Sequence, residues 1–139
     1  EATRRDYYDR LLAVTERGEW EAWIEYFLNG VARQAEDALN RAERINKLLE
    51  KWRMAVLGSS AKVPAALVDQ LAENPYWTIK RLAQRLEVAY TTAQRAMERL
   101  ESLGILTETT DARRGRVYCA TAILKILEEP ANLRASRTT

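Results

Sequence analysis

Residues 85–100, RLEVAYTTAQRAMERL, contain the end of one helical pattern and the beginning of another, with a very short turn between them. Leu86 ends the apolar face of the first pattern, Val88 stands in the turn, and Thr91 or Thr92 is suited to start the second helix. Its inward face is then formed by Ala93, Ala96, Met97 and Leu100. The stretch predicts two helices that cross steeply, with Val88 packed in the angle between them.

Helical signals also lie on both sides of this turn. Pro64 suits the first turn of a helix that Asn74 and Pro75 end. Thr78 is a suitable N-cap for the helix that leads into the turn. Gly104 is a natural stop for the helix that follows it. Three consecutive helices are therefore expected.

Two short strands are predicted after the third helix. They are ILTETT at residues 105–110 and GRVYCAT at residues 115–121, joined by a polar, arginine-containing tip. Cys119 lies in the second strand, where a buried structural thiol is expected rather than a nucleophile. A last amphipathic helix ends at Pro130. Helix, helix, turn, helix and β-hairpin is the order of a winged helix-turn-helix domain.

In such a domain the third helix enters a major groove and the hairpin follows the phosphate backbone. Gln94 and Arg95 are the best candidates for base contacts, because Gln can pair with adenine and Arg with guanine. Arg99, one turn further on, is better placed for phosphate. The residues predicted to contact double-stranded DNA are Lys80, Tyr90, Thr91, Thr92, Gln94, Arg95, Arg99, Arg113, Arg114 and Arg116.

A long helix is predicted from Trp20 to Val56, after a first helix over residues 4–17 that stops at Gly18. Its apolar residues alternate by four and three positions, which is a heptad seam, and Gly30 is the weak point where it is able to bend. The seam consists of Ile24, Leu28, Val31, Ala35, Ala38, Ala42, Ile45, Leu49 and Trp52. Trp20, Trp23, Tyr26 and Phe27 are expected to be core rather than ligand-binding residues. The chain is too short to bury the whole seam, so a homodimer or a missing domain is expected to cover it. The alternative is that the helix folds back on the rest of this chain.

Composition excludes several classes of protein. Of 139 residues, 47% are hydrophobic and 30% charged, which fits a folded domain, and the net charge of +2 means that any basic footprint must be local. Histidine is absent and cysteine occurs once, so neither a catalytic centre within this chain nor a zinc site is expected. No apolar run approaches the roughly 18 residues of a membrane span, and a cytoplasmic protein is expected.

The first third of the chain resembles the C-terminal end of the Fic domain. The resemblance rests on Tyr7-Tyr8, Leu11, Val14, Gly18-Glu19-Trp20, Trp23-Ile24, Tyr26-Phe27-Leu28 and Gly30-Val31. Residues 74–106, NPYWTIKRLAQRLEVAYTTAQRAMERLESLGIL, are similar to the winged helix-turn-helix domain that many bacterial Fic proteins append through a long helix. Glu19 stands where that family commonly has Asp.

The resemblance implies a parent protein that transfers AMP from ATP to a protein hydroxyl. The family's active loop, H-P-F-x-D/E-G-N-G-R, does not occur in this chain, so none of its catalytic residues carries over. ATP and Mg²⁺ are therefore expected only for the missing catalytic part, and no cofactor is expected here.

Taken together, the sequence predicts a mainly α-helical chain in four regions. Residues 1–57 form the end of a Fic-like domain and a long connecting helix, 58–62 a linker, 63–130 a winged helix-turn-helix, and 131–139 a flexible tail. The expected function is DNA binding and regulation of transcription by a non-enzymatic portion of a Fic-family protein. The alternative is a protein-interaction module that positions a protein target for AMP transfer.

Overall fold

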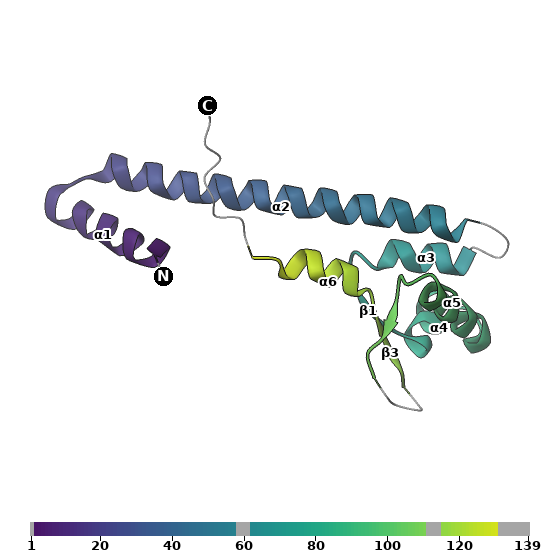
Figure 1. Ribbon diagram of the computed structural model, residues 1–139. Coiled ribbons are helices and arrows are strands. Elements are labelled where there is room, and N and C mark those ends of the chain that lie inside the picture. Colours follow the sequence, from purple (N-terminus) through teal and green to yellow (C-terminus); the bar gives the residue numbers. More distant parts are fainter. Residues whose placement is uncertain (1, 58–61, 111–114, 131–139) are drawn as a thin grey trace. The chain divides into compact units, whose positions relative to one another are not determined.

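A computed structural model describes residues 2–57, 62–110 and 115–130 (Figure 1). The fold is mainly α-helical with a small antiparallel sheet, as the sequence predicts. The chain divides into two compact units, and the boundary between them falls at Asn40–Arg41. The described residues of the first unit are 2–40, and the second unit is Arg41–Pro130. Each unit is described by itself below.

The first unit is a pair of helices, α1 (Ala2–Arg17) and the N-terminal part of α2 (Trp20–Val56). Gly18 ends α1 in a left-handed conformation, with φ of +69°, and its N–H donates to the Val14 carbonyl at 3.0 Å. Such a backbone favours glycine because glycine has no Cβ to clash with the carbonyl. The predicted stop at Gly18 and the predicted extent of the long helix are both confirmed, and Gly30 does not interrupt α2.

Contacts between these two helices are few and lie near their junction. The Arg10 guanidinium donates to the Ala22 carbonyl at 3.3 Å and stacks over the Tyr26 ring at 4.9 Å. Only Ala13 and Val14 are fully buried among the described side chains of residues 4–40. Two helices alone offer too little surface to enclose a core of large side chains.

The expectation that the four aromatic residues of this region form a core is wrong for two of them. Trp20 is 59% exposed and Phe27 is 50% exposed. The Trp23 and Phe27 rings stack on one another at 5.4 Å between centroids, and no further element of this unit covers them among the described residues. The aromatic residues of this region therefore form an apolar surface rather than an interior.

The second unit contains the end of α2 and the remaining elements. These are α3 (Lys62–Gln70), β1 (Tyr76–Thr78), α4 (Ile79–Arg85), α5 (Tyr90–Ser102), β2 (Thr107–Glu108), β3 (Val117–Cys119) and α6 (Thr121–Glu128). The strands form one antiparallel sheet in the order β1-β3-β2. Tyr76 pairs with Cys119 on one side of β3, and Thr107 pairs with Cys119 on the other. Cys119 is buried there, and burial raises the pKa of its thiol.

The sheet differs from the sequence prediction at two of its strands. β1 was not predicted, because it has only three residues and lies between a helix end and an N-cap. β2 is shorter than the predicted strand over 105–110 because Ile105 and Leu106 turn into the hydrophobic core. The predicted strand over 115–121 corresponds to β3, which is also shorter.

The turn between α4 and α5 forms as the opening stretch predicts. Glu87 adopts a left-handed backbone with φ of +53°, and the next N–H, that of Val88, donates to the Ala83 carbonyl at 3.0 Å. Val88 packs partly buried against the core. α5 begins at Tyr90, slightly earlier than predicted, and Ala89 at its N-cap makes no side-chain hydrogen bond. The predicted inward face of α5 is fully buried, as expected.

The end of α2 belongs to this second core. Leu49, Trp52 and Val56 are buried in the same cluster as the apolar faces of α3, α4, α5 and α6. The heptad seam is therefore divided: its last positions are covered within the second unit, whereas its earlier positions, from Ile24 to Ala42, are exposed. The boundary between the two compact units therefore falls inside α2. Residues 58–61 lie outside the described residues, as do 131–139, and Lys62 begins α3.

Two arginines of α2 bind the C-terminal end of α6. The Arg41 guanidinium donates to the carbonyl oxygens of Leu127 at 2.5 Å and Glu129 at 2.6 Å. The Arg44 guanidinium donates to both carboxylate oxygens of Glu129, at 2.5 and 2.7 Å. Carbonyls at a helix C-terminus lack partners within the helix, so Arg41 satisfies groups that would otherwise need water.

The Arg44–Glu129 ion pair makes stability depend on pH in a definite direction. The hydrogen bond from Arg44 lowers the pKa of Glu129 below its ordinary value. A carboxylate whose pKa is lower in the folded state stabilises the fold above its unfolded pKa, and this contribution is lost as the pH falls through the lowered folded pKa. We expect Arg44→Ala to reduce the free energy of unfolding slightly at pH 7. As the pH falls below about 4.3, the free energy of unfolding should decrease less in this variant than in wild type.

Urea denaturation of both proteins at neutral and acidic pH measures this difference. Lys51→Ala is the matched control, because Lys51 lies on the same helix, is exposed and has no ion pair with a described residue. The control should keep the wild-type pH dependence. The same pH dependence in Arg44→Ala as in wild type would contradict the assignment.

Candidate nucleic-acid interface

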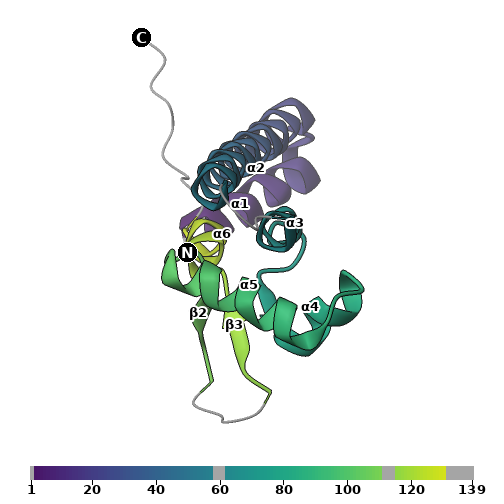
Figure 2. The same ribbon diagram turned by 90° about the vertical axis from the view of Figure 1, so that its right-hand side faces the viewer.

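Four of the residues predicted to contact DNA line one pocket of the second unit. The pocket, of about 580 Å³, lies between α4, the first turns of α5 and β3, and we call it the α4–α5–β3 pocket. Its lining residues are Thr78, Ile79, Lys80, Tyr90, Gln94, Glu98, Gly115, Arg116 and Tyr118. Figures 1 and 2 show that α4, α5 and the β2–β3 hairpin are neighbours in this unit. Residues distant in sequence are thus brought to one concave surface.

Lys80 enters the pocket because Thr78 fixes the start of α4. The Thr78 hydroxyl accepts a hydrogen bond from the Arg81 N–H at 3.2 Å, which confirms the predicted N-cap. Ile79 is buried at the start of the helix, while Lys80 next to it is exposed. The Arg81 side chain stacks over the Trp77 ring at 4.6 Å and is held against the sheet. Lys80 is the cation of this turn that lines the pocket.

The exposed surface of α5 has two edges. Tyr90, Gln94 and Glu98 recur every four residues and form the edge that lines the pocket. Arg95 and Arg99 are exposed but do not line the pocket. Each successive residue of a helix is rotated by about 100°, so these two arginines lie further around α5 than Glu98, on the side away from the pocket. Thr91 and Thr92 are exposed in the first turn. The predicted contact residues of α5 are therefore brought together in two strips rather than one.

The β2–β3 hairpin contributes Arg116 to the pocket. Its guanidinium lies 3.6 Å from the Glu108 carboxylate. The Tyr118 side chain and, after it, the Glu108 carboxylate raise the pKa of Arg116, so the side chain is fully cationic. The other two predicted arginines of the hairpin, Arg113 and Arg114, lie outside the described residues.

Acidic residues interrupt the positive charge of this surface. Glu98 belongs to the edge of α5 that lines the pocket, and Glu108 is paired with Arg116. The Gln94 amide donates to the Glu98 carboxylate at 2.8 Å. Neither Glu98 nor Tyr118 was predicted from the sequence to belong to this surface, although both line the pocket. An aromatic residue in the middle of the second hairpin strand was the available signal for Tyr118.

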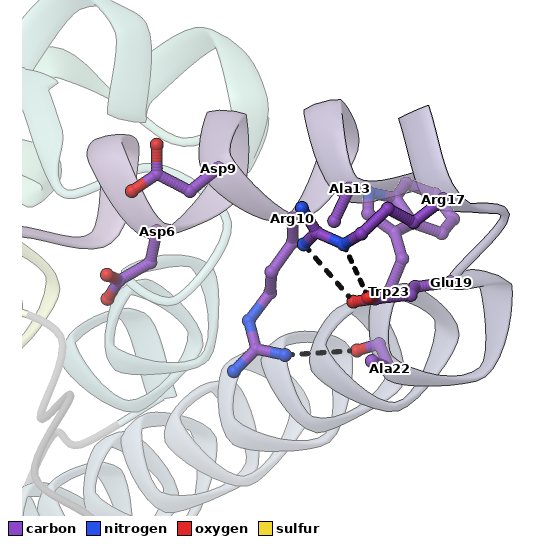
Figure 3. A pocket seen from close by; sticks show the side chains of 8 residues that line it. All are labelled: Asp6, Asp9, Arg10, Ala13, Arg17, Glu19, Ala22 and Trp23. Atoms are coloured by element: carbon purple, nitrogen blue, oxygen red, sulfur yellow. Dashed lines mark hydrogen bonds and ion pairs between the residues drawn. The ribbon is translucent and has the colours of Figure 1, made fainter. Parts of the chain in front are cut away.

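A separate pocket of about 300 Å³ lies at the junction of α1 and α2 in the first unit (Figure 3). Its charged groups are largely used in local contacts: Arg17 donates to Glu19 at 2.6 Å, and Arg10 to the Ala22 carbonyl. The hydrogen bond from Arg17 lowers the pKa of Glu19. The buried Trp23 indole N–H has no acceptor among the described residues. These contacts hold the corner between two helices and do not form a nucleophile–base arrangement.

No protein-family model matches the chain. Within residues 2–57, 62–110 and 115–130, no group of three or more acidic or cysteine side chains is arranged to hold a metal ion. No helix in the described part of the chain is both long enough and apolar enough to cross a bilayer.

Proposed function

We propose that the second unit is a winged helix-turn-helix domain that binds double-stranded DNA. The observation that carries the proposal is the α4–α5–β3 pocket, where Lys80, Tyr90, Gln94 and Arg116 come together from α4, α5 and the hairpin. In this proposal α5 is the recognition helix and the β2–β3 hairpin is the wing. Lys80 and Arg116, which line the pocket beside α5, are suited to bind phosphates, and the exposed residues of α5 are suited to contact the bases.

We further propose that the chain is a non-catalytic portion of a Fic-family protein that regulates transcription in the cytoplasm. The residues that carry the resemblance to this family fall on α1, on its junction with α2 and on the first turns of α2. ATP and Mg²⁺ would serve only the catalytic part of such a protein. The DNA-binding role does not depend on this assignment, because it rests on residues of the second unit.

One observation favours a second candidate function. Glu98 and Glu108 stand among the cations of the proposed DNA surface and reduce its positive potential. A domain that binds a protein with both basic and acidic side chains would use the same surface. This alternative is the protein-interaction module, which would position a protein target for AMP transfer.

Salt-dependent DNA binding separates the two candidates. We expect wild type to bind random-sequence duplex DNA, with an affinity that falls linearly with salt on a double-logarithmic plot. The variant Lys80→Ala/Arg116→Ala should bind more weakly to every sequence, with a slope shallower by about 2, because each lost phosphate contact removes about 1 from the slope. Arg95→Ala should instead weaken selection among sequences.

Lys125→Ala is the control for loss of a positive charge, since Lys125 is exposed on α6 and does not line the pocket. It should retain the wild-type slope. Absence of binding at low salt by a folded wild-type chain would exclude the DNA-binding function and favour a protein partner.

We also propose that the exposed surface of the first unit is covered by a second copy of the chain. The α1–α2 apolar surface has ten large exposed side chains: Tyr7, Tyr8, Leu11, Leu12, Trp20, Ile24, Phe27, Leu28, Val31 and Leu39. At roughly 100 Å² each, they leave on the order of 1,000 Å² uncovered, more than the roughly 800 Å² that each partner buries in a standard interface. The heptad spacing of Ile24, Leu28 and Val31 suits packing against an equivalent helix.

A further inference from the structure

Arg116 is attached to a fixed part of the hairpin backbone. It comes immediately before β3, and the next residue, Val117, is bonded through both of its backbone groups to the segment that follows β2. The Thr109 N–H donates to the Val117 carbonyl at 2.8 Å, and the Val117 N–H donates to the Thr110 hydroxyl at 3.1 Å. The base of the Arg116 side chain is therefore held in place at the α4–α5–β3 pocket.

Two side chains of the hairpin flank the Arg116 guanidinium. Glu108 and Tyr118 are direct partners across β2 and β3, and such partners lie on the same face of a sheet. Arg116 shares this face, since it stands two residues before Tyr118 and both line the pocket. The guanidinium lies 3.6 Å from the Glu108 carboxylate, and its hydrogen bond with the Tyr118 hydroxyl is the largest cause that raises the pKa of Arg116.

Tyr118 is a rigid support for this contact. It is 2% exposed, belongs to the hydrophobic core and pairs with Trp77 on the other side of β3. A ring that is packed in this way stays in one place. The Arg116 side chain, in contrast, is 50% exposed. A guanidinium has several N–H donors, so those that Glu108 and Tyr118 do not use remain available for the oxygens of a ligand.

This inference rests on the proposed DNA-binding function: we propose that Tyr118 is a positioning residue, which holds the Arg116 guanidinium ready for a phosphate of the DNA. A free arginine side chain has many rotamers, and ordering it during binding costs affinity. Tyr118, with Glu108 beside it, orders the side chain before the DNA arrives. Because Tyr118 is buried, it acts through Arg116 and not through a phosphate contact of its own.

Tyr118 gives a cleaner test than Glu108. Glu108 holds Arg116, but its negative charge also repels a phosphate, so replacing Glu108 changes both effects at once. Tyr118→Phe removes one hydroxyl group from a buried ring and changes no charge. This variant therefore isolates positioning.

The first measurement is a double-mutant cycle on duplex DNA with wild type, Tyr118→Phe, Arg116→Ala and the double variant. We expect Tyr118→Phe to raise Kd by about three- to tenfold for every sequence, because ordering one long side chain costs affinity of this size. Its salt slope should stay that of wild type, since Arg116 keeps its charge, whereas Arg116→Ala makes the slope shallower by about 1. In the Arg116→Ala background, Tyr118→Phe should change Kd by less than about twofold.

Tyr76→Phe is the matched control, because it removes the same hydroxyl group from the neighbouring strand β1. Tyr76 pairs with Cys119, which follows Tyr118 on β3, so its side chain lies on the opposite face of the sheet and does not line the pocket. This variant should bind DNA as wild type does. Urea denaturation of each variant shows whether it is folded.

A second measurement examines the Arg116 side chain in the absence of DNA. Nitrogen-15 relaxation of the Arg116 Nε–H reports its motion on the picosecond to nanosecond timescale. We expect its order parameter to be high in wild type and in Tyr76→Phe, and lower in Tyr118→Phe.

The outcomes separate this inference from the function on which it rests. Wild type that binds DNA while Tyr118→Phe binds equally well overturns the inference alone. Additive effects of the two substitutions also overturn it, because Tyr118 would then act through the fold or through its own contact. The same conclusion follows if the Arg116 Nε–H is as mobile in wild type as in Tyr118→Phe. Absence of any DNA binding at low salt by a folded wild-type chain overturns both the function and the inference.

Discussion

Replacing Trp52 with alanine is expected to lower the free energy of unfolding of the second unit by about 3–5 kcal/mol. Trp52 is 6% exposed and lies near the end of α2, inside the cluster that contains Leu67, Leu82 and Met97. Removing a large aromatic side chain from such a core loses its burial and leaves a cavity that neighbouring residues fill only in part. Urea denaturation followed by far-ultraviolet circular dichroism measures the change, at a fixed protein concentration.

Met54→Ala is the matched control for this prediction. Met54 is two residues from Trp52 on the same helix and is 69% exposed. Its replacement should change the free energy of unfolding by no more than about 0.5 kcal/mol. If both variants were equally stable, the end of α2 would not be part of the core, and the boundary between units would belong near residues 58–62 after all.

The elements of the second unit were predictable where local signals agree with tertiary packing. Thr78 caps α4, and the spacing of Ala93, Ala96 and Met97 gave the buried face of α5. β1 could not be found in this way, since its three residues acquire strand geometry only by pairing with β3. The same holds for the short extent of β2, because burial of Ile105 and Leu106 is set by the core around them.

The heptad seam shows what periodicity leaves open. The spacing from Ile24 to Val56 is uniform, and nothing in it marks the point where α2 changes from an exposed helix to part of a core. That change depends on which residues distant in sequence pack against it. Leu49 and Trp52 meet α3 and its neighbours in the second unit, whereas Leu28 is 57% exposed.

The candidate site was predictable residue by residue but not as an arrangement. Lys80, Gln94 and Arg116 were chosen for charge and hydrogen-bonding capacity, and the pocket that unites them follows from the crossing of α4 and α5 beside β3. The pairing of Gln94 with Glu98 was not foreseen, although their four-residue spacing on a helix permits it. The pairing uses one of the two N–H groups of the Gln94 amide, and the expected contact with adenine stays a prediction.

The double substitution Leu28→Asp/Val31→Asp is expected to convert a dimer of the chain into a monomer. Both residues are about half exposed on the α1–α2 apolar surface, and a second copy would bury them. Each buried carboxylate without a partner costs several kcal/mol, so the dissociation constant of the dimer should rise by more than about 100-fold. Sedimentation equilibrium should give wild type twice the 16.0 kDa mass of one chain, and the variant that mass once.

Asn40→Asp provides the control for this experiment, because it adds one carboxylate to the opposite side of α2. It should remain dimeric. The variant Leu28→Asp/Val31→Asp should keep the circular dichroism and urea midpoint of the second unit, because neither residue belongs to that core. A monomeric wild type at tens of micromolar would exclude the second copy as the occupant of this surface. A variant that stayed dimeric would place the dimer contact elsewhere on the chain. If the double variant is monomeric while wild type and Asn40→Asp are dimeric, the exposed part of the heptad seam forms the dimer contact.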